Sequence, residues 1–524
     1  MVSFHNQEYL NINEYSAKKP GKLSYWLGGG VLLMLSIAMF LVNTRHGIGV
    51  LPDSVRYMGL GYVPFDAPLY PWLLDIAMLT GLTVEKSAVV LGFIFVCANT
   101  ALIWLVLTRS AGKFVYAIVG TAIIIFSPQF VSLHSLALSE PTFLFFLLLT
   151  LYTILLYTET QNRAWLIVSG ITLGLATLAR FTAPPLGAAI VLALLLDPRY
   201  FLVRRFSDAI IFASVSACIF LSWVLVSHLV ADQSVGTIGR EFSFHGNMEL
   251  RQWLRSLESL AQWLLPKQVP LIGRIVVFVA TAGTAAWFTL KYIRETWGHL
   301  GRAKAAPLLV MILGLFFFFY LAFVRLATMI EANLSLTPRY AFPAFVTTVI
   351  MLTIVLAHYS GKENKPKLIH RGLVAFFILV LGSNLIRTTV RSQEAYQMGT
   401  GFASVTWSNS PTMQKVRELP DNAVIYSNGP DAISYLLRRR ANLVPQHFEL
   451  RTGLDDQRSP YDVQLQNLRD DMAKENAYLV IFDNVDWRFY LATEAELKKS
   501  LPLLEFKSES DGRIYSMSKA TQKE

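Results

Sequence analysis

Long apolar stretches recur along the first 388 residues and constrain the fold of this chain more than any other feature. About 20 consecutive apolar residues cross the hydrocarbon core of a bilayer as one helix. Such stretches lie at 23–42, 87–108, 114–130, 138–158, 164–180, 183–196, 206–230, 271–290, 307–328, 340–358 and 372–388, the sixth being the shortest. The sequence therefore predicts an all-α polytopic membrane domain with about 11 transmembrane helices.

Composition agrees with extensive lipid contact. Of all residues, 53% are hydrophobic and 16% are charged, whereas a soluble domain carries about 25% charged residues. The net charge of +10 is uneven, because residues 1–388 carry 29 Lys and Arg against 17 Asp and Glu, while residues 389–524 carry 17 against 19. The basic excess therefore belongs to the membrane part, where loop topology explains it better than a nucleic acid-binding patch.

Basic residues gather in alternate loops. The segments 1–22, 109–113, 159–163, 197–205, 291–306 and 359–371 carry 17 Lys and Arg in 70 residues. The opposite segments, 43–86, 131–137, 180–183, 231–270 and 325–339, carry 10 in 110 residues. The positive-inside rule then predicts a multi-pass protein of the inner or plasma membrane with a cytoplasmic N-terminus. The first span lacks a small-residue cleavage site, so we expect it to be an uncleaved anchor.

The recurrence of long apolar stretches ends at residue 388. We expect helices at 410–419, 432–440 and 461–475, and strands at 422–427, 477–482, 502–507 and 513–517. With a cytoplasmic N-terminus and an odd number of spans, we expect residues 389–524 on the extracytoplasmic side of the membrane. The prediction is a transmembrane domain at 1–388 and a small soluble extracytoplasmic α/β domain at 389–524. The second domain has no Gly-rich phosphate loop and no metal-ligand cluster, so nothing indicates independent catalysis.

Two long loops, 43–86 and 231–270, lie on the predicted outer face, where long ordered loops usually carry function. The second has apolar residues at helical spacing opposite Arg251, Arg255, Glu258 and Gln262. This pattern predicts a helix in the membrane interface, for which anchoring is the simplest role.

The first outer loop combines Asp53 and Asp66 with Arg56, Tyr57 and Tyr70. A carboxylate just beyond a membrane span can act as a general base toward an acceptor hydroxyl, and shielding from water would raise its basicity. A structural alternative is equally open, because Asp53 could be the N-cap of a helix in "PDSVRYM".

This loop resembles the first extracytoplasmic loop of the GT-C superfamily of membrane glycosyltransferases, which use polyprenyl-phosphate-linked sugars. That group includes protein O-mannosyltransferase-like and aminoarabinose-transferase-like enzymes. The matching elements are Asp53, Tyr57, Phe65, Asp66 and "APLYP" at 67–71. Further stretches resemble the same superfamily in order: "SLALSEPTFLFF", "GITLGLATLARFTAPPLG", "LTPRYAFPAF" and, in the tail, "VIYSNGPDAISYLLRR" with "YLVIFD".

The resemblance implies a GT-C-like fold and an inverting hexosyl or pentosyl transfer, in which an acceptor hydroxyl displaces polyprenyl phosphate from the sugar. Asp53 matches the position of the family's proposed base. The leaving phosphate needs cations, and Arg180 and Arg339 fall on matching positions, with Tyr340 beside Arg339. Arg56 and Arg325 are further candidates at outer ends of spans. Arginine also occurs at membrane ends simply because its head reaches the interface.

Glu140 and His134 complete the predicted substrate-binding set of Asp66, Arg56, Tyr57, Tyr70, His134, Glu140, Arg180, Arg339 and Tyr340. Glu140 could instead complement a helix dipole, and a lone histidine is more often structural. Asp53, Asp66 and His134 could together hold a divalent metal, but no ligand spacing supports this, so no metal site or cofactor is predicted. The implied partners are the lipid-linked donor, the bilayer, and an acceptor that is a glycan, lipid or protein.

Membrane proteins of other functional classes would show different sequence features. A transporter or lipid flippase predicts ionisable residues at midspan and interrupted helices in matching halves. The apolar stretches are nearly free of midspan charge, and interrupted helices in matching halves are not evident in them. A receptor-like protein with a ligand-binding tail would leave the first outer loop unexplained.

Overall fold

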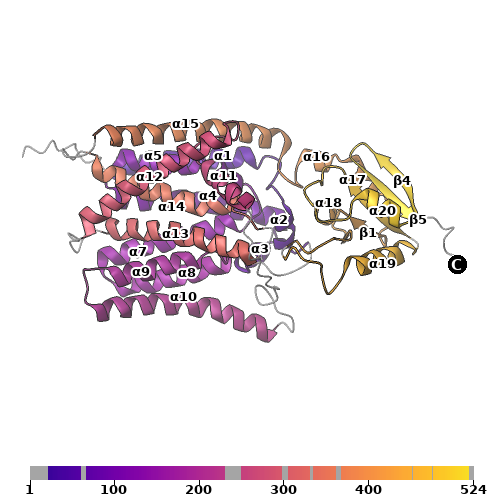
Figure 1. Cartoon of the computed structure of the whole chain (residues 1–524), viewed down its shortest axis with the longest axis horizontal. Coiled ribbons are helices and arrows are strands. Elements are labelled where there is room, and N and C mark those ends of the chain that lie inside the picture. The colour runs from indigo at the N-terminus through magenta and orange to yellow at the C-terminus, as the bar shows by residue number, and fades with distance from the viewer. Residues whose placement is uncertain are drawn as a thin grey trace, which may run out of the picture.

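A computed structural model describes residues 22–60, 67–230, 250–297, 305–330, 334–360, 367–450, 452–474 and 476–517. Its larger part is a bundle of long, roughly parallel helices, and its smaller part is a compact α/β unit at one end of that bundle (Figure 1).

The bundle helices coincide with the predicted apolar stretches. They are α1 (Lys22–Asn43), α4 (Val84–Ala111), α5 (Phe114–Ile125), α6 (Pro128–His134), α7 (Glu140–Thr160), α8 (Arg163–Ala179), α9 (Pro184–Leu196), α10 (Leu202–Val230), α12 (Leu271–Trp297), α13 (Ala306–Ile330), α14 (Pro338–Tyr359) and α15 (Lys367–Met398). Among the described residues, 8 helices are long and apolar enough to cross a membrane, or 9 if α5 and α6 form one span.

The expected count of 11 spans is not confirmed, because two of the predicted stretches form shorter helices. Helix α8 has 17 residues and α9 has 13. At a rise of 1.5 Å per residue, α9 is about 20 Å long, which is less than the hydrocarbon core of about 30 Å.

The third predicted stretch is bent by 59° between α5 and α6. Pro128 cannot continue the first helix, and Ser127 starts the second one by accepting a hydrogen bond from the backbone N–H of Phe130. The stretch expected as one span at 114–130 is therefore divided into two helices. The described residues contain one such bent pair, not the two in matching halves that a repeated transporter fold would show.

The inner helices α7 and α14 differ from the outer ones in burial. In their most apolar windows, 78% and 83% of the residues are buried, against 17% for α1, α10, α12 and α15. Helix α10 packs closely on α8, because a Cβ at Gly174 would lie 2.8 Å from the Cβ of Ile219. Burial of α7 and α14 fixes the positions of the polar residues at their N-terminal ends.

Three short helices lie toward the end of the bundle that faces the tail (Figure 1): α2 (Pro52–Tyr57), α3 (Leu69–Met78) and α11 (Leu250–Ala261). The last confirms the helix expected in the second outer loop; residues 231–249 of that loop lie outside the described residues. The chain before α2 is held on two sides, since Gly49 pairs with Leu136 and Val50 pairs with Gly401. Gly401 has a φ of +63°, and a Cβ there would lie 2.1 Å from the carbonyl oxygen of Val50.

The α/β unit contains α16 (Val405–Ser408), α17 (Pro411–Arg417), β1 (Val424–Ser427), α18 (Pro430–Leu437), β2 (Asn442–Leu443), α19 (Tyr461–Met472), β3 (Ala477–Phe482), α20 (Glu494–Ser500), β4 (Leu503–Glu509) and β5 (Gly512–Met517). The sheet has the order β2-β1-β3-β5-β4. Strands β2, β1 and β3 are parallel, whereas β5 pairs antiparallel with β3 and β4. Every predicted element is present, while β2, α16 and α20 were not expected.

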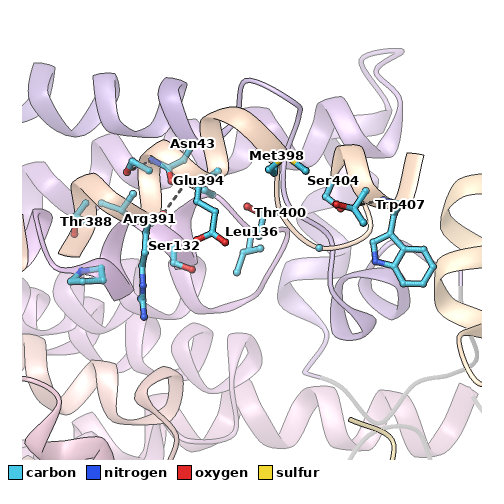
Figure 2. Close-up of a pocket in the computed structure, with 18 residues that line it drawn as sticks. Asn43, Ser132, Leu136, Thr388, Arg391, Glu394, Met398, Thr400, Ser404 and Trp407 are labelled. Atoms are coloured by element: carbon cyan, nitrogen blue, oxygen red, sulfur yellow. Dashed lines mark hydrogen bonds between the residues drawn. The ribbon is translucent and has the colours of Figure 1, made fainter. Parts of the chain in front are cut away.

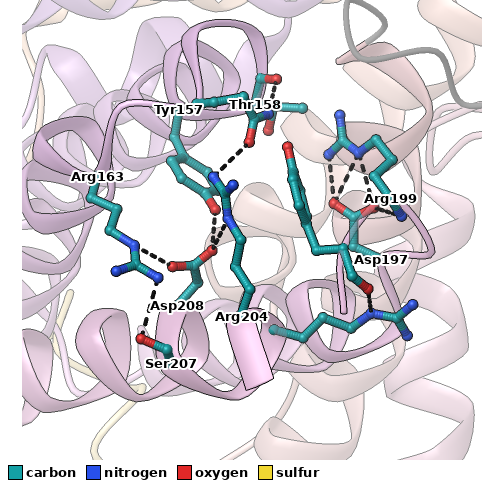
Figure 3. A network of polar contacts seen from close by, with 11 residues as sticks. Tyr157, Thr158, Arg163, Asp197, Arg199, Arg204, Ser207 and Asp208 are labelled. Carbon is teal, nitrogen blue, oxygen red and sulfur yellow. Dashed lines mark hydrogen bonds and ion pairs between the residues drawn. The ribbon is translucent and has the colours of Figure 1, made fainter. Parts of the chain in front are cut away.

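The opposite end of the bundle carries a network of paired charges (Figure 3). Tyr157 donates to Asp208 at 2.5 Å, and Arg163 contacts the same carboxylate at 2.8 Å. Next to them, Arg199 pairs with Asp197 at 2.6 Å. The two contacts of Asp208 tie the end of α7 and the start of α8 to α10, and the Arg199–Asp197 pair is local to the α9–α10 connection. The network lies at the end of the bundle away from the tail (Figure 1).

Candidate functional site

Asp53 lies in the first turn of α2, but it does not cap this helix. The N-cap residue is Leu51, whose backbone N–H donates to the Ser54 hydroxyl at 3.0 Å. The Asp53 carboxylate instead bonds Arg56 at 2.9 Å and Arg339 at 2.7 Å. The structural alternative of an N-cap is therefore wrong, and Asp53 faces the beginning of α14.

Glu140 begins α7 and extends this set of charges. Its side chain is 5% exposed, and it pairs with Arg180 at 2.7 Å and with Arg339. Arg339 therefore lies between the carboxylates of Asp53 and Glu140. The helix dipole favours an acid at this position, but the two arginine partners show that Glu140 also positions cations.

Arg180 follows the last residue of α8 and completes the cluster. Its guanidinium lies 5.3 Å from the ring centroid of Tyr340 and donates to the Ser139 hydroxyl at 3.3 Å. The Tyr57 hydroxyl lies 3.3 Å from the same Ser139 oxygen. Tyr70 is buried and packs edge-on against Tyr57, with centroids 5.6 Å apart, so it supports the cluster from behind.

A cavity of about 570 Å³ opens beside these charges. Its walls come from the bundle and from the tail: Asp53, Arg56, Tyr57, Ala67, Ser139, Ala179, Arg180, Phe181, Thr182, Arg255, Phe323, Ala327, Leu334, Arg339, Tyr340, Leu450, Trp487, Phe489 and Tyr490. Four guanidinium groups line it, while the carboxylates of Asp53 in its wall and Glu140 beside it supply two negative charges. Counted over the described residues, the site therefore has two positive charges in excess, which suits an anionic ligand.

The pKa of Asp53 is lower than the usual value for an aspartate. Burial by itself would raise this pKa, but the charges of Arg339 and Arg56 and their hydrogen bonds outweigh it. The expectation that shielding makes Asp53 more basic was therefore wrong. The carboxylate stays ionised and can accept a hydrogen bond from a hydroxyl, as a general base must before it takes the proton.

The structure does not bring all predicted site residues together. His134 is 1% exposed and does not line the cavity. One ring nitrogen donates to the Phe130 carbonyl at 2.7 Å, and the other accepts from the Asn99 amide at 2.9 Å. Arg325 lies over the Trp253 ring at 4.1 Å, outside the cavity wall.

Asp66 and Phe65 fall outside the described residues, so their predicted roles stay predictions. Among the residues that the structure describes, no group of three or more His, Cys, Asp and Glu side chains could hold a metal ion.

Sequence reasoning missed several cavity residues. Arg255 was visible on the polar face of the predicted interfacial helix, but nothing in the pattern placed it in the wall of the same cavity as Asp53. The cluster "DWRFY" at 486–490 is unusually aromatic for a soluble domain, and this was the available signal for Trp487 and Phe489.

A second cavity, of about 640 Å³, lies between α6, the end of α15 and the 399–404 turn (Figure 2). Its polar groups include Arg391 and Glu394, and Asn43 donates to Ser392 at 2.8 Å in its wall. Among its lining residues only Arg391 is an arginine. It lacks the carboxylate between two guanidinium groups that distinguishes the first cavity.

Known proteins can now be compared with this geometry. The model of the dolichyl-phosphate-mannose-protein mannosyltransferase family matches residues 65–226, a stretch that includes Glu140 and Arg180. No curated protein matches the chain. Among solved structures, apo ArnT from Cupriavidus metallidurans matches with a TM-score of 0.58 at 14% identity, over 95% of this chain and 98% of that one. The chain has the GT-C fold.

Two more GT-C structures support this assignment. ArnT bound to undecaprenyl phosphate matches with a TM-score of 0.57 at 14% identity, over 94% of this chain and 98% of that one. The oligosaccharyltransferase AglB from Archaeoglobus fulgidus, in complex with an inhibitory peptide and a dolichol-phosphate, matches with 0.51 at 14% identity, over 95% of this chain and 74% of that one. The GT-C resemblance inferred from the motifs is confirmed.

Proposed function

We propose that this chain is an integral membrane glycosyltransferase that moves a sugar from a polyprenyl-phosphate-linked donor to an acceptor hydroxyl on the extracytoplasmic face, with inversion at the sugar. One observation carries the proposal: the carboxylate of Asp53 and the guanidinium groups of Arg180 and Arg339 line the same cavity. A base for the attacking hydroxyl and cations for the leaving phosphate are thus within one small volume.

Arg180 and Arg339 would bind the donor phosphate. A guanidinium group can bond two phosphate oxygens at once, and the excess of two positive charges remains after the two carboxylates are counted. The GT-C structures of ArnT with undecaprenyl phosphate and of AglB with a dolichol-phosphate support a donor of this class. Arg56 and Arg255 line the same wall and would contribute to the field.

In the reaction, the acceptor oxygen forms a bond to the anomeric carbon, while the bond between that carbon and the phosphate oxygen breaks. The hydroxyl proton passes to Asp53, and the electron pair leaves with the phosphate. The donor phosphodiester carries one negative charge and the released phosphate carries two. Arginines that bind this group therefore stabilise the transition state more than the bound donor.

Phosphate binding would also adjust Asp53. In the described structure, Arg339 holds the pKa of Asp53 down. A phosphate that shares Arg339 offsets part of that positive charge, so the pKa of Asp53 would rise toward its usual value when the donor is bound. The base would then become effective once the leaving group is in place.

The direction of the protein in the membrane is part of the proposal. The site and the tail lie at one end of the bundle, and the paired basic residues of the α7–α8 and α9–α10 connections lie at the other. Together with the positive-inside rule, this supports a cytoplasmic N-terminus, a membrane domain at 1–388 and an extracytoplasmic domain at 389–524. A membrane-impermeant maleimide should label a cysteine introduced at the exposed His46 from outside intact cells; labelling only after permeabilisation would contradict this orientation.

The proposal can be tested with purified protein, envelope membranes as the acceptor source and a labelled polyprenyl-phosphate sugar. Asp53→Asn should slow transfer about 100-fold or more while leaving the fold intact. Asp75→Asn is the matched control, because Asp75 lies in the exposed part of α3 and does not line the cavity. Full transfer activity in the Asp53→Asn protein would remove Asp53 from the mechanism.

A further inference from the structure

The tail contributes aromatic side chains to the cavity that holds Asp53. Trp487, Phe489 and Tyr490 line it together with Leu450. Trp487 is 49% exposed and Phe489 is 65% exposed. Large exposed aromatic side chains cost solubility unless they bind something, so their place beside a charged cavity needs an explanation.

The segment that carries these rings is firmly held. Arg488, between them, is 9% exposed; it donates to the Asn428 carbonyl at 3.1 Å and pairs with Asp431. Its guanidinium also lies 4.7 Å from the Trp487 ring centroid. The buried Tyr490 packs 6.1 Å from Phe489. Trp487 and Phe489 are therefore presented by an anchored segment, as a preformed binding surface requires.

We propose that Trp487 and Phe489 bind a sugar ring of the acceptor, so that the acceptor is a carbohydrate, either a free glycan or the head group of a glycolipid. This inference rests on the proposed transferase function. The C–H groups on one face of a pyranose carry partial positive charge, and they pack against the negative face of an aromatic ring. The hydroxyls at the ring edge remain free to meet polar partners, which this cavity offers in Arg255 and Asp53.

The positions of the two sets of residues fit two substrates that enter from different sides. Arg180 and Arg339 lie at the ends of bundle helices, where a lipid carrier presents its phosphate. Trp487 and Phe489 belong to the tail, which would lie on the aqueous side in the proposed orientation. We call the surface formed by Trp487 and Phe489 the platform. A sugar ring bound on this platform would direct a hydroxyl into the cavity toward Asp53, between the platform and the phosphate.

An extended peptide fits this cavity less well. Peptides commonly bind by adding a strand to a free sheet edge. The edge strands of the tail are β2 and β4, and none of their residues lines the cavity. The volume of about 570 Å³ falls within the range of small-ligand sites.

The first test identifies what occupies the platform. Photoreactive benzoylphenylalanine is placed at position 487 of the full-length Asp53→Asn protein, in cells that supply native acceptors, and at position 506 as a control. Phe506 lies on β4, is 47% exposed and does not line the cavity. We expect a periodate-sensitive adduct at 487 only, whose mass gives a saccharide with or without lipid. A peptide adduct, a lipid without sugar, or no adduct above the control would overturn the inference.

A kinetic test separates this inference from the proposed function. Trp487→Ala should raise the acceptor KM about tenfold or more and leave binding of undecaprenyl phosphate unchanged, while Trp487→Phe and the control Phe506→Ala stay near wild type. If transfer depends on Asp53 but Trp487→Ala behaves as wild type, the proposed sugar-binding role of Trp487 is refuted, while the proposed transferase function is retained. If Asp53→Asn transfers normally, the proposed function itself has failed.

Discussion

Arg339→Gln is the substitution that disturbs the site most selectively. In the described structure, Arg339 bridges Asp53 at 2.7 Å and Glu140. Glutamine keeps a polar side chain but removes the charge. Glu140 keeps Arg180 and Asp53 keeps Arg56, so neither carboxylate is left alone and the fold should survive.

The size of the effect follows from the charges. Four arginines and two carboxylates leave an excess of two positive charges, and the substitution halves that excess. The phosphate gains a negative charge as the sugar leaves, so the loss should lower kcat more than it weakens donor binding. Removing one such donor typically costs about 2.7–4 kcal/mol of transition-state stabilisation, which corresponds to about 100- to 1,000-fold in rate.

The pH profile gives an independent readout. Asp53 must be ionised to accept a proton, so the rate falls as the pH drops through its pKa. Arg339 is the strongest of the interactions that lower this pKa, and the opposing effect of burial remains after its removal. The acid limb of the rate profile should therefore move to higher pH in Arg339→Gln than in wild type.

The assay measures transfer from a labelled polyprenyl-phosphate sugar between pH 4 and 8, and binding of undecaprenyl phosphate separately. Arg325→Gln is the matched control, because Arg325 is an arginine near the outer end of α13 that does not line the cavity. Wild-type kcat in Arg339→Gln, or an acid limb that does not move, would refute the proposed role of this residue.

Further predictions concern the framework. Gly401→Ala should lower Tm clearly, because alanine at a φ of +63° is strained and its Cβ would meet the Val50 carbonyl; Gly382→Ala, which has open space, should not, and scanning fluorimetry compares them. Gly174→Leu should separate α10 from α8 and reduce yield and Tm, whereas Gly283→Leu on α12 should leave both near wild type. In the tail, burial would raise the pKa of Glu494, but bonds from Tyr515, Arg513 and Lys498 lower it to about 2, so its stabilising effect should be present above about pH 4.5 and lost as the pH falls toward 2; the same difference in Tm between wild type and Glu494→Gln at about pH 6 and at about pH 2 would contradict this.

The sequence was sufficient to predict the positions of most bundle helices and of most helices and strands in the tail. Apolar length predicts a spanning helix well because lipid demands it, and Ser410 before Pro411 marked the start of α17 where the structure has it. It was not sufficient for α8 and α9, whose apolar stretches form helices of only 17 and 13 residues. A short helix that is buried among other helices is as apolar as a helix that crosses the bilayer. Composition alone therefore does not distinguish a short buried helix from a transmembrane helix.

The site was predictable as a set of residues but not as a geometry. Asp53, Glu140, Arg180 and Arg339 were proposed from their places near outer ends of apolar stretches and from the GT-C resemblance, and the structure brings them into one cluster. The lowered pKa of Asp53 depends on Arg339, which lies far along the chain, so local reasoning predicted the wrong direction. His134 has the same position at a helix end, yet it turns inward to Asn99, a choice that only packing decides.

The most direct test of the central claim is an experimental structure of this protein with undecaprenyl phosphate. We expect the phosphate within hydrogen-bond distance of Arg180 and Arg339, with Asp53 facing the position of the transferred sugar. A phosphate bound in the second cavity beside Arg391, with the Asp53–Arg339 and Glu140–Arg180 pairs undisturbed, would contradict it.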